Sequence, residues 1–323
     1  MKTISVVTPC YNEEENVAEL CSRIRATMAK LPAYRYEHLL IDNCSADRTV
    51  EVLRNLAEED RNIRVIVNAR NFGAARSHLH ALLQARGDAV IMMVADLQDP
   101  PEIICEFVRL WEQGNPMVLA IKTASQENRL MFLVRRAYYR LIERLASMPT
   151  IENFTGFGLY DRRVVEIIRS FPDPNPYFRG IVAEIGLPFA EIKFTQPRRL
   201  RGISKFSNFY ALYDLAMVAV TNLSRIPLRA VTFLGFFSSL LSLLSAVVYF
   251  LYKLIFWFSF SVGMAPIVIG LFFFGSVQLL ALGIIGEYLG SVHTYVQNRP
   301  LVVERERINF DAADGAGDGG RAS

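Results

Sequence analysis

The first 125 residues alternate short apolar runs with segments in which apolar residues recur every three or four positions. Apolar runs of about four to eight residues are typical of strands buried on both faces, and the longer spacing is typical of helices. This alternation predicts an α/β fold with a largely parallel, doubly wound sheet. The predicted strands cover residues 4–8, 39–42, 63–68, 89–96 and 117–122. Helices are predicted within residues 17–31, 50–57 and 75–83, the first of them capped by Asn12 with Glu15.

Hydrophobic residues make up 52% of the 323-residue chain, and the excess is concentrated in residues 230–252 and 263–286. Both stretches are uncharged, and each is longer than the ~20 residues that span a bilayer core. Lys253 is the only charged side chain between Arg229 and Glu287. The pattern predicts two transmembrane helices, with buried helices of a globular domain as the alternative.

Charge predicts the orientation of these helices. Basic residues precede the first apolar stretch and follow the second, whereas the connecting loop carries only Lys253. Because basic flanks stay in the cytoplasm, we expect a hairpin with both termini cytoplasmic and a short outer loop. The flanking residues are Arg225, Arg229, Arg299, Arg305 and Arg307.

These patterns divide the chain into four parts. Residues 1–205 form the predicted cytoplasmic domain, and residues 206–228 form an interfacial helix or linker. Residues 229–290 form the two-helix hairpin, and residues 291–323 form a cytoplasmic tail that we expect to be disordered from about residue 311. The formal net charge of +3 is too small to argue for a nucleic-acid partner.

Polar side chains follow several of the predicted strands, where ligands bind in open α/β sheets. Tyr11 offers a stacking surface for a nucleotide base, and Asp42 offers acceptors to a base or ribose. Asp96 and Gln98 offer two oxygen ligands to a hard cation such as Mg²⁺ or Mn²⁺. An Asp-Pro turn ahead of Pro100 is the alternative for this last segment. Neither G-x-G-x-x-G nor a P-loop follows a predicted strand, which argues against those phosphate sites.

The motifs taken together resemble the inverting family-2 glycosyltransferases. The similarity is greatest to the branch that moves a sugar from a nucleotide onto polyprenyl phosphate, which includes dolichyl-phosphate mannosyltransferase-like and bactoprenol glucosyltransferase-like enzymes. It extends over nearly the whole chain. The matching segments are residues 5–14, Asp42 with Ser45 and Asp47, residues 70–73, residues 95–102, Arg199 with Gly202, Ser204 and Lys205, residues 286–290 and residues 299–301.

The resemblance implies a GT-A nucleotide-sugar-binding domain, a UDP-linked sugar donor and an undecaprenyl phosphate acceptor. It also implies an enzyme of the bacterial inner membrane that contributes to cell-envelope glycan or lipid modification and that forms a homo-oligomer. Asp96 and Gln98 would hold the divalent metal against the diphosphate. The resemblance implies donor contacts from Pro9, Tyr11, Glu13, Asp42 and Asp96, and phosphate or acceptor contacts from Arg199, Ser204 and Lys205.

Two positions depart from the family pattern. Val94 stands where many members have a first acid, and Gly156 stands where related enzymes have an acid suggested as the catalytic base. A phosphate monoester has a second pKa of about 6, so the acceptor is largely dianionic and can attack without a protein base. Asp161 is the remaining candidate for a catalytic acid besides Asp96, with a cap of the helix that starts at Arg162 as its alternative.

Three other hypotheses stay open at this point. Val94 and Gly156 are compatible with a non-catalytic, membrane-anchored protein that binds a nucleotide sugar. A processive polysaccharide synthase is disfavoured, because Trp111 and Trp257 do not lie in a Gln-x-x-Arg-Trp segment. The basic residues 198–205 are also compatible with simple attraction to anionic membrane lipid.

Overall fold

The computed structural model describes residues 1–124, 151–171, 173–174, 176–197, 226–255, 264–297 and 299–310. The chain divides into two compact units. Unit 1 holds the described residues of Met1–Tyr139, Met148–Leu212 and Asn298–Ser323, and unit 2 holds those of Arg140–Ser147 and Tyr213–Gln297. Most of the predicted interfacial segment and the tail from residue 311 lie outside the described residues.

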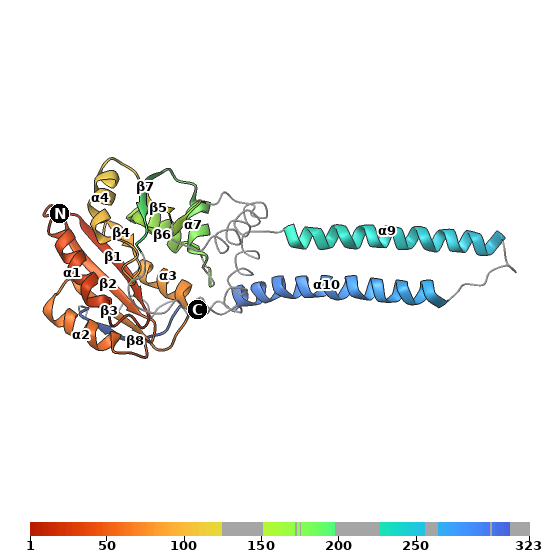
Figure 1. Ribbon diagram of the computed structural model, residues 1–323, viewed down its shortest axis with the longest axis horizontal. Helices are drawn as coiled ribbons and strands as arrows, with labels where there is room; N and C mark the ends of the chain where they lie inside the picture. The colour runs from red at the N-terminus through yellow and green to blue at the C-terminus, as the bar shows by residue number, and fades with distance from the viewer. Residues whose placement is uncertain are drawn as a thin grey trace. The chain divides into compact units, whose positions relative to one another are not determined.

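Unit 1 is built on an eight-stranded sheet in the order β7-β5-β6-β4-β1-β2-β3-β8 (Figure 1). Strands β1 to β4 are parallel to one another, as the sequence predicts. The sheet is nevertheless mixed, because β6 runs antiparallel to β4 and β5, and β8 runs antiparallel to β3. The strands are Thr3–Cys10 (β1), Arg35–Asp42 (β2), Ile63–Asn68 (β3), Ala89–Met92 (β4), Met117–Ala124 (β5), Phe154–Asp161 (β6), Phe189–Thr195 (β7) and Glu304–Ile308 (β8).

Helices pack on both faces of this sheet, each through its apolar side. One buried cluster joins the sheet to α1, α2 and α4, and a second joins it to α3, α6 and α7. The three predicted helices are confirmed as α1, α2 and α3. The helices of unit 1 are Val17–Met28 (α1), Thr49–Glu59 (α2), Ala74–Gln84 (α3), the 3-10 turn Pro101–Ile103 (η1), Ile104–Glu112 (α4), Arg162–Arg169 (α6) and Phe178–Ile185 (α7).

Two local predictions are wrong. Helix α1 begins at Val17, and the Asn12 side chain accepts a hydrogen bond from Ala46 N at 2.8 Å instead of capping the helix. Strand β4 ends at Met92 rather than at Asp96. A backbone hydrogen bond from Met93 N to the Val7 carbonyl of β1, 3.0 Å long, follows the end of the strand, and the chain then leaves the sheet.

The C-terminal strand β8 returns to the sheet of unit 1 and pairs with β3. Ala69 N donates to the Val303 carbonyl at 2.9 Å, so the pairing continues into the loop after β3. Glu304 lies 2.6 Å from His80 Nε2 on α3, and Arg307 Nη2 donates to the same carboxylate at 2.8 Å. Although partial burial raises it, these contacts lower the pKa of Glu304 from 4.5 to about 2.

We expect Glu304→Gln to lower the free energy of unfolding at pH 7 by about 1.5–3 kcal/mol, the range for hydrogen bonds to charged groups. The folded-state pKa of Glu304 lies below its ordinary value, so its stabilisation is present above pH 4.5 and disappears toward pH 2. Thermal unfolding of parent and variant should therefore differ at pH 7 and converge in acid. Glu306→Gln is the control, because the Glu306–Arg54 pair is more exposed and worth about 0–1 kcal/mol. Equal effects of both variants would contradict this account.

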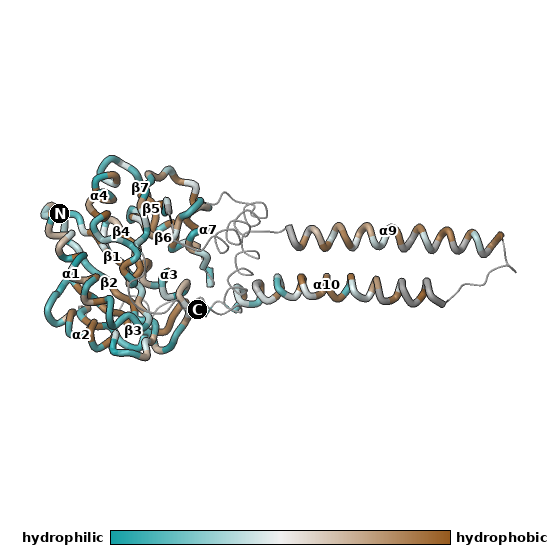
Figure 2. Tube along the Cα trace, viewed as in Figure 1, coloured by the Kyte–Doolittle hydropathy of each residue, from teal (hydrophilic) through white to brown (hydrophobic). Residues whose placement is uncertain are grey.

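Unit 2 consists of the helices Ile226–Ile255 (α9) and Met264–Val296 (α10), which contact each other. Large apolar side chains along both helices are exposed, and Figure 2 shows apolar residues along the length of each. Among the described residues, Phe273–Val296 is long and apolar enough to cross a membrane, and Ala230–Leu241 is a shorter apolar helical segment. The predicted helices are thus present, whereas a pair of membrane spans remains a proposal.

Candidate functional site

The carboxyl ends of the four parallel strands lie at one edge of the sheet. Cys10 at the end of β1 is level with Asp42 at the end of β2, which is level with Val67 in β3. Met92 at the end of β4 pairs with Val7 on the other side of β1. The loops that follow these strands therefore form one surface, which we call the donor edge: residues 11–16, 43–48, 69–73 and 93–100.

The first two loops of the donor edge are hydrogen-bonded to each other. Asn12 N donates to Ser45 Oγ at 2.8 Å, and Ala46 N donates to Asn12 Oδ1 at 2.8 Å. Glu13 N donates to Thr49 Oγ1 at 2.9 Å. Asn12 has a φ of 53°, in the left-handed region that Asn enters more easily than most residues. These bonds fix the backbone beside Tyr11, the residue predicted to stack on a base.

Asp42 is fully buried beneath these loops. Its carboxylate accepts from Ser45 N at 3.0 Å and from Ser45 Oγ. Burial raises the pKa of Asp42, and the hydrogen bonds from Ser45 only partly oppose that rise. Asp42 thus anchors the loop after β2, while its contact with a base or ribose stays a prediction. Glu13 is also buried and accepts from Asn16 Nδ2 at 2.7 Å.

An asparagine network, which the sequence analysis missed, connects the second and third loops. Asn43 Nδ2 donates to Asn71 Oδ1 at 2.9 Å, and Asn43 Oδ1 accepts from Asn68 Nδ2 and from Phe72 N. Asn68 Nδ2 also donates to Ser77 Oγ at 3.1 Å, at the start of α3. Among the described residues, the buried Asn68 Oδ1 has no hydrogen-bond partner. The sequence does contain a signal for this network, because Asn43 and Asn68 stand at the ends of two strands that are adjacent in the sheet.

The loop after β4 keeps the alternation of buried and half-buried residues that is typical of a strand, although it is no longer part of the sheet. Ala95 and Leu97 are buried in the core, and Asp96 and Gln98, each the next residue along the chain, are half-buried. Gln98 N donates to Asp96 Oδ1 at 3.2 Å. Gln98 Nε2 donates to the carbonyl of Pro197 at 3.4 Å, which leaves Oε1 as the amide atom that can bind a cation.

These two residues fit a divalent metal that is completed by its substrate. One carboxylate and one amide oxygen are hard ligands, and Mg²⁺ commonly binds one or two carboxylates together with substrate phosphates and water. Within the described ranges, no group of three or more His, Cys, Asp and Glu residues could hold a metal ion. The chemistry of Asp96 and Gln98 therefore matches a metal bound together with a diphosphate.

Asp99 is a second acid of this loop to which the sequence analysis gave no role. Its side chain is 3% exposed, and Oδ2 accepts from Val94 N at 3.1 Å. Burial raises the pKa of Asp99 to about 7, the hydrogen bond from Val94 opposes the rise, and Asp96 adds to it. The positive charge of Lys122 on β5 lowers the pKa of Asp99.

Asp161 lies at the opposite edge of the sheet, which corrects its predicted catalytic role. It pairs with Ala89, the first residue of β4, whereas Asp96 follows the last residue of that strand. Asp161 caps α6, because Oδ1 accepts from Arg163 N at 2.9 Å. Oδ2 accepts from Trp111 Nε1 at 2.7 Å. The capping alternative is confirmed, and Asp161 is not a candidate base.

Comparison with known proteins identifies the family of this chain. The family described as Glycosyl transferase family 2 matches residues 5–169, about half of the chain. The chain belongs to this family. It is 33% identical to the SfII prophage-derived bactoprenol glucosyl transferase of Shigella flexneri, over 93% of this chain and 96% of that protein. It is 34% identical to an uncharacterized glycosyltransferase of Synechocystis, over 92% and 93% of the two chains.

Solved structures give more distant matches. The glucosyl-3-phosphoglycerate synthase of Mycobacterium tuberculosis in complex with uridine-diphosphate is 18% identical, with a TM-score of 0.47. The match covers 68% of this chain and 78% of that one. Family membership itself makes the chain a glycosyltransferase with a GT-A, Rossmann-like α/β fold.

Two glycines of β6 in this family-2 glycosyltransferase lie where a side chain would be strained. Gly156 has a φ of +103°, which L side chains rarely adopt, and its carbonyl accepts from Tyr160 Oη at 2.9 Å. At Gly158, a Cβ atom would lie 2.7 Å from the Val118 carbonyl oxygen. A carboxylate side chain at either position would require a shift of the β6 backbone.

The predicted acceptor residues Arg199, Ser204 and Lys205 of this glycosyltransferase lie outside the described residues. Pro197 is the last described residue before them, and it contacts Gln98. Pro197 thus lies at the donor edge, next to a predicted metal ligand.

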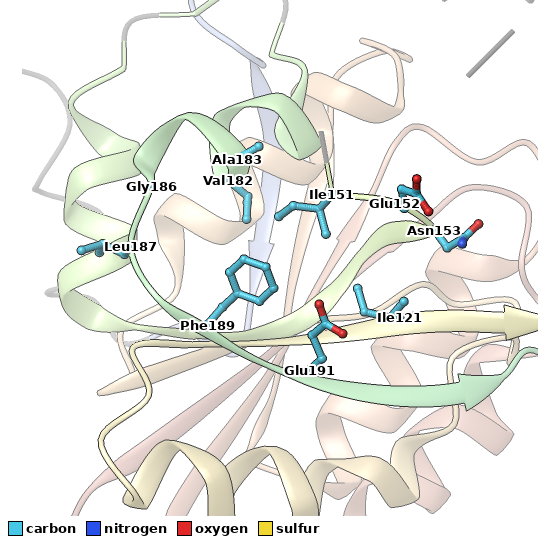
Figure 3. Close-up of a pocket in the computed structure, with 10 residues that line it drawn as sticks. All are labelled: Ile121, Ile151, Glu152, Asn153, Val182, Ala183, Gly186, Leu187, Phe189 and Glu191. Carbon is cyan, nitrogen blue, oxygen red and sulfur yellow. The ribbon is translucent and has the colours of Figure 1, made fainter. Parts of the chain in front are cut away.

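A separate pocket of about 510 Å³ lies among β5, β7 and α7 (Figure 3). Its lining is mainly apolar, and two carboxylates, one just ahead of β6 and one on β7, contribute to it. The predicted site residues are not among those that line it. The residues that give it this character are Ile121, Val182, Leu187, Phe189, Glu152 and Glu191.

Proposed function

We propose that this glycosyltransferase transfers a sugar from a UDP-linked donor to polyprenyl phosphate at the cytoplasmic face of a bacterial membrane. The observation that carries the proposal is that the loop with Asp96 and Gln98 and the loop anchored by Asp42 and Ser45 follow strands β4 and β2, which flank β1 and end at the same edge of the sheet. A nucleoside diphosphate needs a base site and a metal-binding phosphate site at the same surface, and the donor edge carries candidates for both. The relative named bactoprenol glucosyl transferase supports a polyprenyl acceptor.

In this proposal the donor edge binds the nucleotide and orients its leaving group. Tyr11 and Asp42 would flank the base and ribose, and the hydrogen-bonded loops would keep them in place before the donor binds. Asp96 and Gln98 would hold the divalent metal, which neutralises charge on the departing diphosphate when it is bound.

The acceptor supplies its own nucleophile. An oxygen of the dianionic phosphate monoester forms a bond to C1 of the sugar, and the bond from C1 to the nucleoside diphosphate breaks with inversion. The attacking oxygen carries no proton at neutral pH, so this step releases none and requires no base. Gly156 is consistent with that chemistry, because a base would be dispensable for a phosphate nucleophile and indispensable for most hydroxyl acceptors.

Incubation of the purified full chain with polyprenyl phosphate and a panel of UDP- and GDP-sugars tests the proposal. We expect mass spectrometry to detect a glycosyl phospholipid with a UDP-sugar in the presence of Mg²⁺ or Mn²⁺. The same assay discriminates a non-catalytic binding protein, which would retain donor without forming product. Transfer to a growing polysaccharide in place of the lipid would contradict the proposal.

The membrane part of the proposal rests on the two long helices. Helices α9 and α10 have 30 and 33 residues, and at 1.5 Å per residue each is about 45–50 Å long, more than the ~30 Å bilayer core. Side chains such as Phe236, Phe237 and Leu279 are more than 60% exposed, which is unfavourable in water and favourable in lipid.

We expect a two-span hairpin with both termini in the cytoplasm. Reporter domains fused after Ser323 and inserted within residues 259–263 should report opposite sides of the membrane, because in this topology the loop between the two spans lies outside the cytoplasm. An additional fusion ahead of Met1 is the control and should agree with the C-terminal fusion. Matching signals from the loop and the C-terminus would exclude this topology.

A further inference from the structure

We propose that Asp99 is a positioning residue that closes the loop bearing Asp96 and Gln98 and so fixes the spacing of their oxygen atoms. This inference rests on the proposed donor site and assigns a function to an acid that the proposed chemistry does not use. Asp99 itself is only 3% exposed, whereas Asp96 and Gln98 are half-buried.

The hydrogen bond from Val94 N to Asp99 Oδ2 spans the whole metal-binding loop. It is 3.1 Å long and joins the first residue of the segment 94–99 to the last. A buried carboxylate is costly unless it is hydrogen-bonded, so its retention inside the domain indicates that this closure contributes to the loop. This hydrogen bond uses only the backbone N–H of residue 94, so it is compatible with the apolar side chain of Val94.

The loop between these two residues adopts a conformation that needs such support. Leu97 has a φ of 61°, in the left-handed region that is unfavourable for a residue with a branched side chain. Leu97 and Ala95 are buried in the core cluster beneath α1 and α4. Two apolar anchors and the Asp99 carboxylate thus hold the inner side of the loop.

The outer side of the same loop carries both predicted metal ligands. Gln98 N donates to Asp96 Oδ1 at 3.2 Å, so the Asp96 side chain is coupled to the Gln98 backbone. Gln98 is also directly followed by Asp99, and any shift of Asp99 moves the Gln98 backbone. Loss of the Val94–Asp99 closure should therefore disturb the cation site even though Asp99 does not touch the cation.

The experiment measures Mn²⁺ binding to the full chain in detergent by electron paramagnetic resonance, with UDP present. Asp99→Ala removes the acceptor and should weaken Mn²⁺ binding by about tenfold or more, the usual effect of losing an outer-sphere partner. Asp99→Asn keeps an oxygen for Val94 N and should bind Mn²⁺ nearly as the parent does. Asp99→Glu keeps the charge but displaces the oxygen, and should resemble Asp99→Ala. This order distinguishes positioning from a simple effect of negative charge, which predicts the reverse order for Asn and Glu.

Asp161→Ala is the matched control, because Asp161 also accepts a backbone N–H bond but lies at the opposite edge of the sheet. It should lower the unfolding temperature and leave Mn²⁺ binding unchanged. If Asp99→Ala does not fold, the Asn and Glu variants still decide between the two accounts.

Unchanged Mn²⁺ affinity in a folded Asp99→Ala protein would overturn the inference, as would a loss of affinity in Asp99→Asn equal to that in Asp99→Ala. Absence of Mn²⁺ binding by the parent with UDP would overturn it as well. If the parent binds Mn²⁺ with UDP and the variants follow the expected order, the positioning role stands even when lipid product is absent. Absence of lipid product would in that case reject only the polyprenyl acceptor of the proposed function.

Discussion

Asp96→Asn is expected to reduce sugar transfer by at least about a hundredfold while leaving the fold intact. A bound metal stabilises a developing oxyanion by several kcal/mol, and each 1.36 kcal/mol is a factor of about ten in rate. The variant is conservative in structure, because an asparagine oxygen can still accept the bond from Gln98 N. The change therefore removes the charge of the ligand and keeps the loop. Gln98→Ala should have the same direction of effect.

Rates with saturating UDP-sugar and polyprenyl phosphate, measured across a range of Mg²⁺ and Mn²⁺ concentrations, check this expectation. Chelation should stop transfer by the parent, and added metal should restore it. Asp88→Asn is the control: Asp88 accepts from Thr3 N at 2.7 Å just ahead of β4, at the other end of that strand. Its activity should stay near that of the parent. Retention of most activity by Asp96→Asn would remove the metal assignment.

Arg199→Ala and Lys205→Ala should each reduce transfer by about ten- to a hundredfold, because a hydrogen bond to a charged group contributes about 1.5–3 kcal/mol. Both residues follow Pro197 in the sequence, and the Pro197 carbonyl accepts a hydrogen bond from Gln98, a predicted metal ligand. A guanidinium and an ammonium group there would bind phosphate of the donor or of the lipid acceptor.

Arg201→Ala is the control within the same segment, since it removes a basic residue to which no phosphate contact is assigned. Membrane insertion of all three variants should be unchanged, because none of these residues lies in a predicted span. The dependence of the rate on lipid concentration separates a defect in acceptor binding from one in chemistry. Equal, mild effects at the three positions would mean that the segment is only an electrostatic contact with the membrane.

The strand-end rule located the donor edge without any knowledge of pairing partners. An apolar run that ends in Asp42 or leads to Asp96 already predicts a polar edge, because parallel strands bring their carboxyl ends together. The structure brings the loops that carry these residues to one edge. Asp161 became a candidate through its closeness to Gly156 in the sequence, with no strand predicted there. It ends a strand that runs antiparallel to β4, so its carboxylate lies at the opposite edge, and the direction of β6 was not visible in its own residues.

Local periodicity by itself determined which segments of this protein form its first helices and parallel strands and where its two long apolar helices lie, because burial of a face or of a whole segment is written in consecutive residues. The tertiary structure decided what depends on partners far apart in the chain: the Asn43–Asn68 network, the docking of β8 on β3 and the burial of Asp99. Asp99 is polar in sequence and adjacent to a predicted ligand, so its pattern favours exposure. Asp99 is buried next to the core residues Ala95 and Leu97, where its carboxylate accepts a hydrogen bond from Val94 N. That environment forms only when the sheet and its helices pack together.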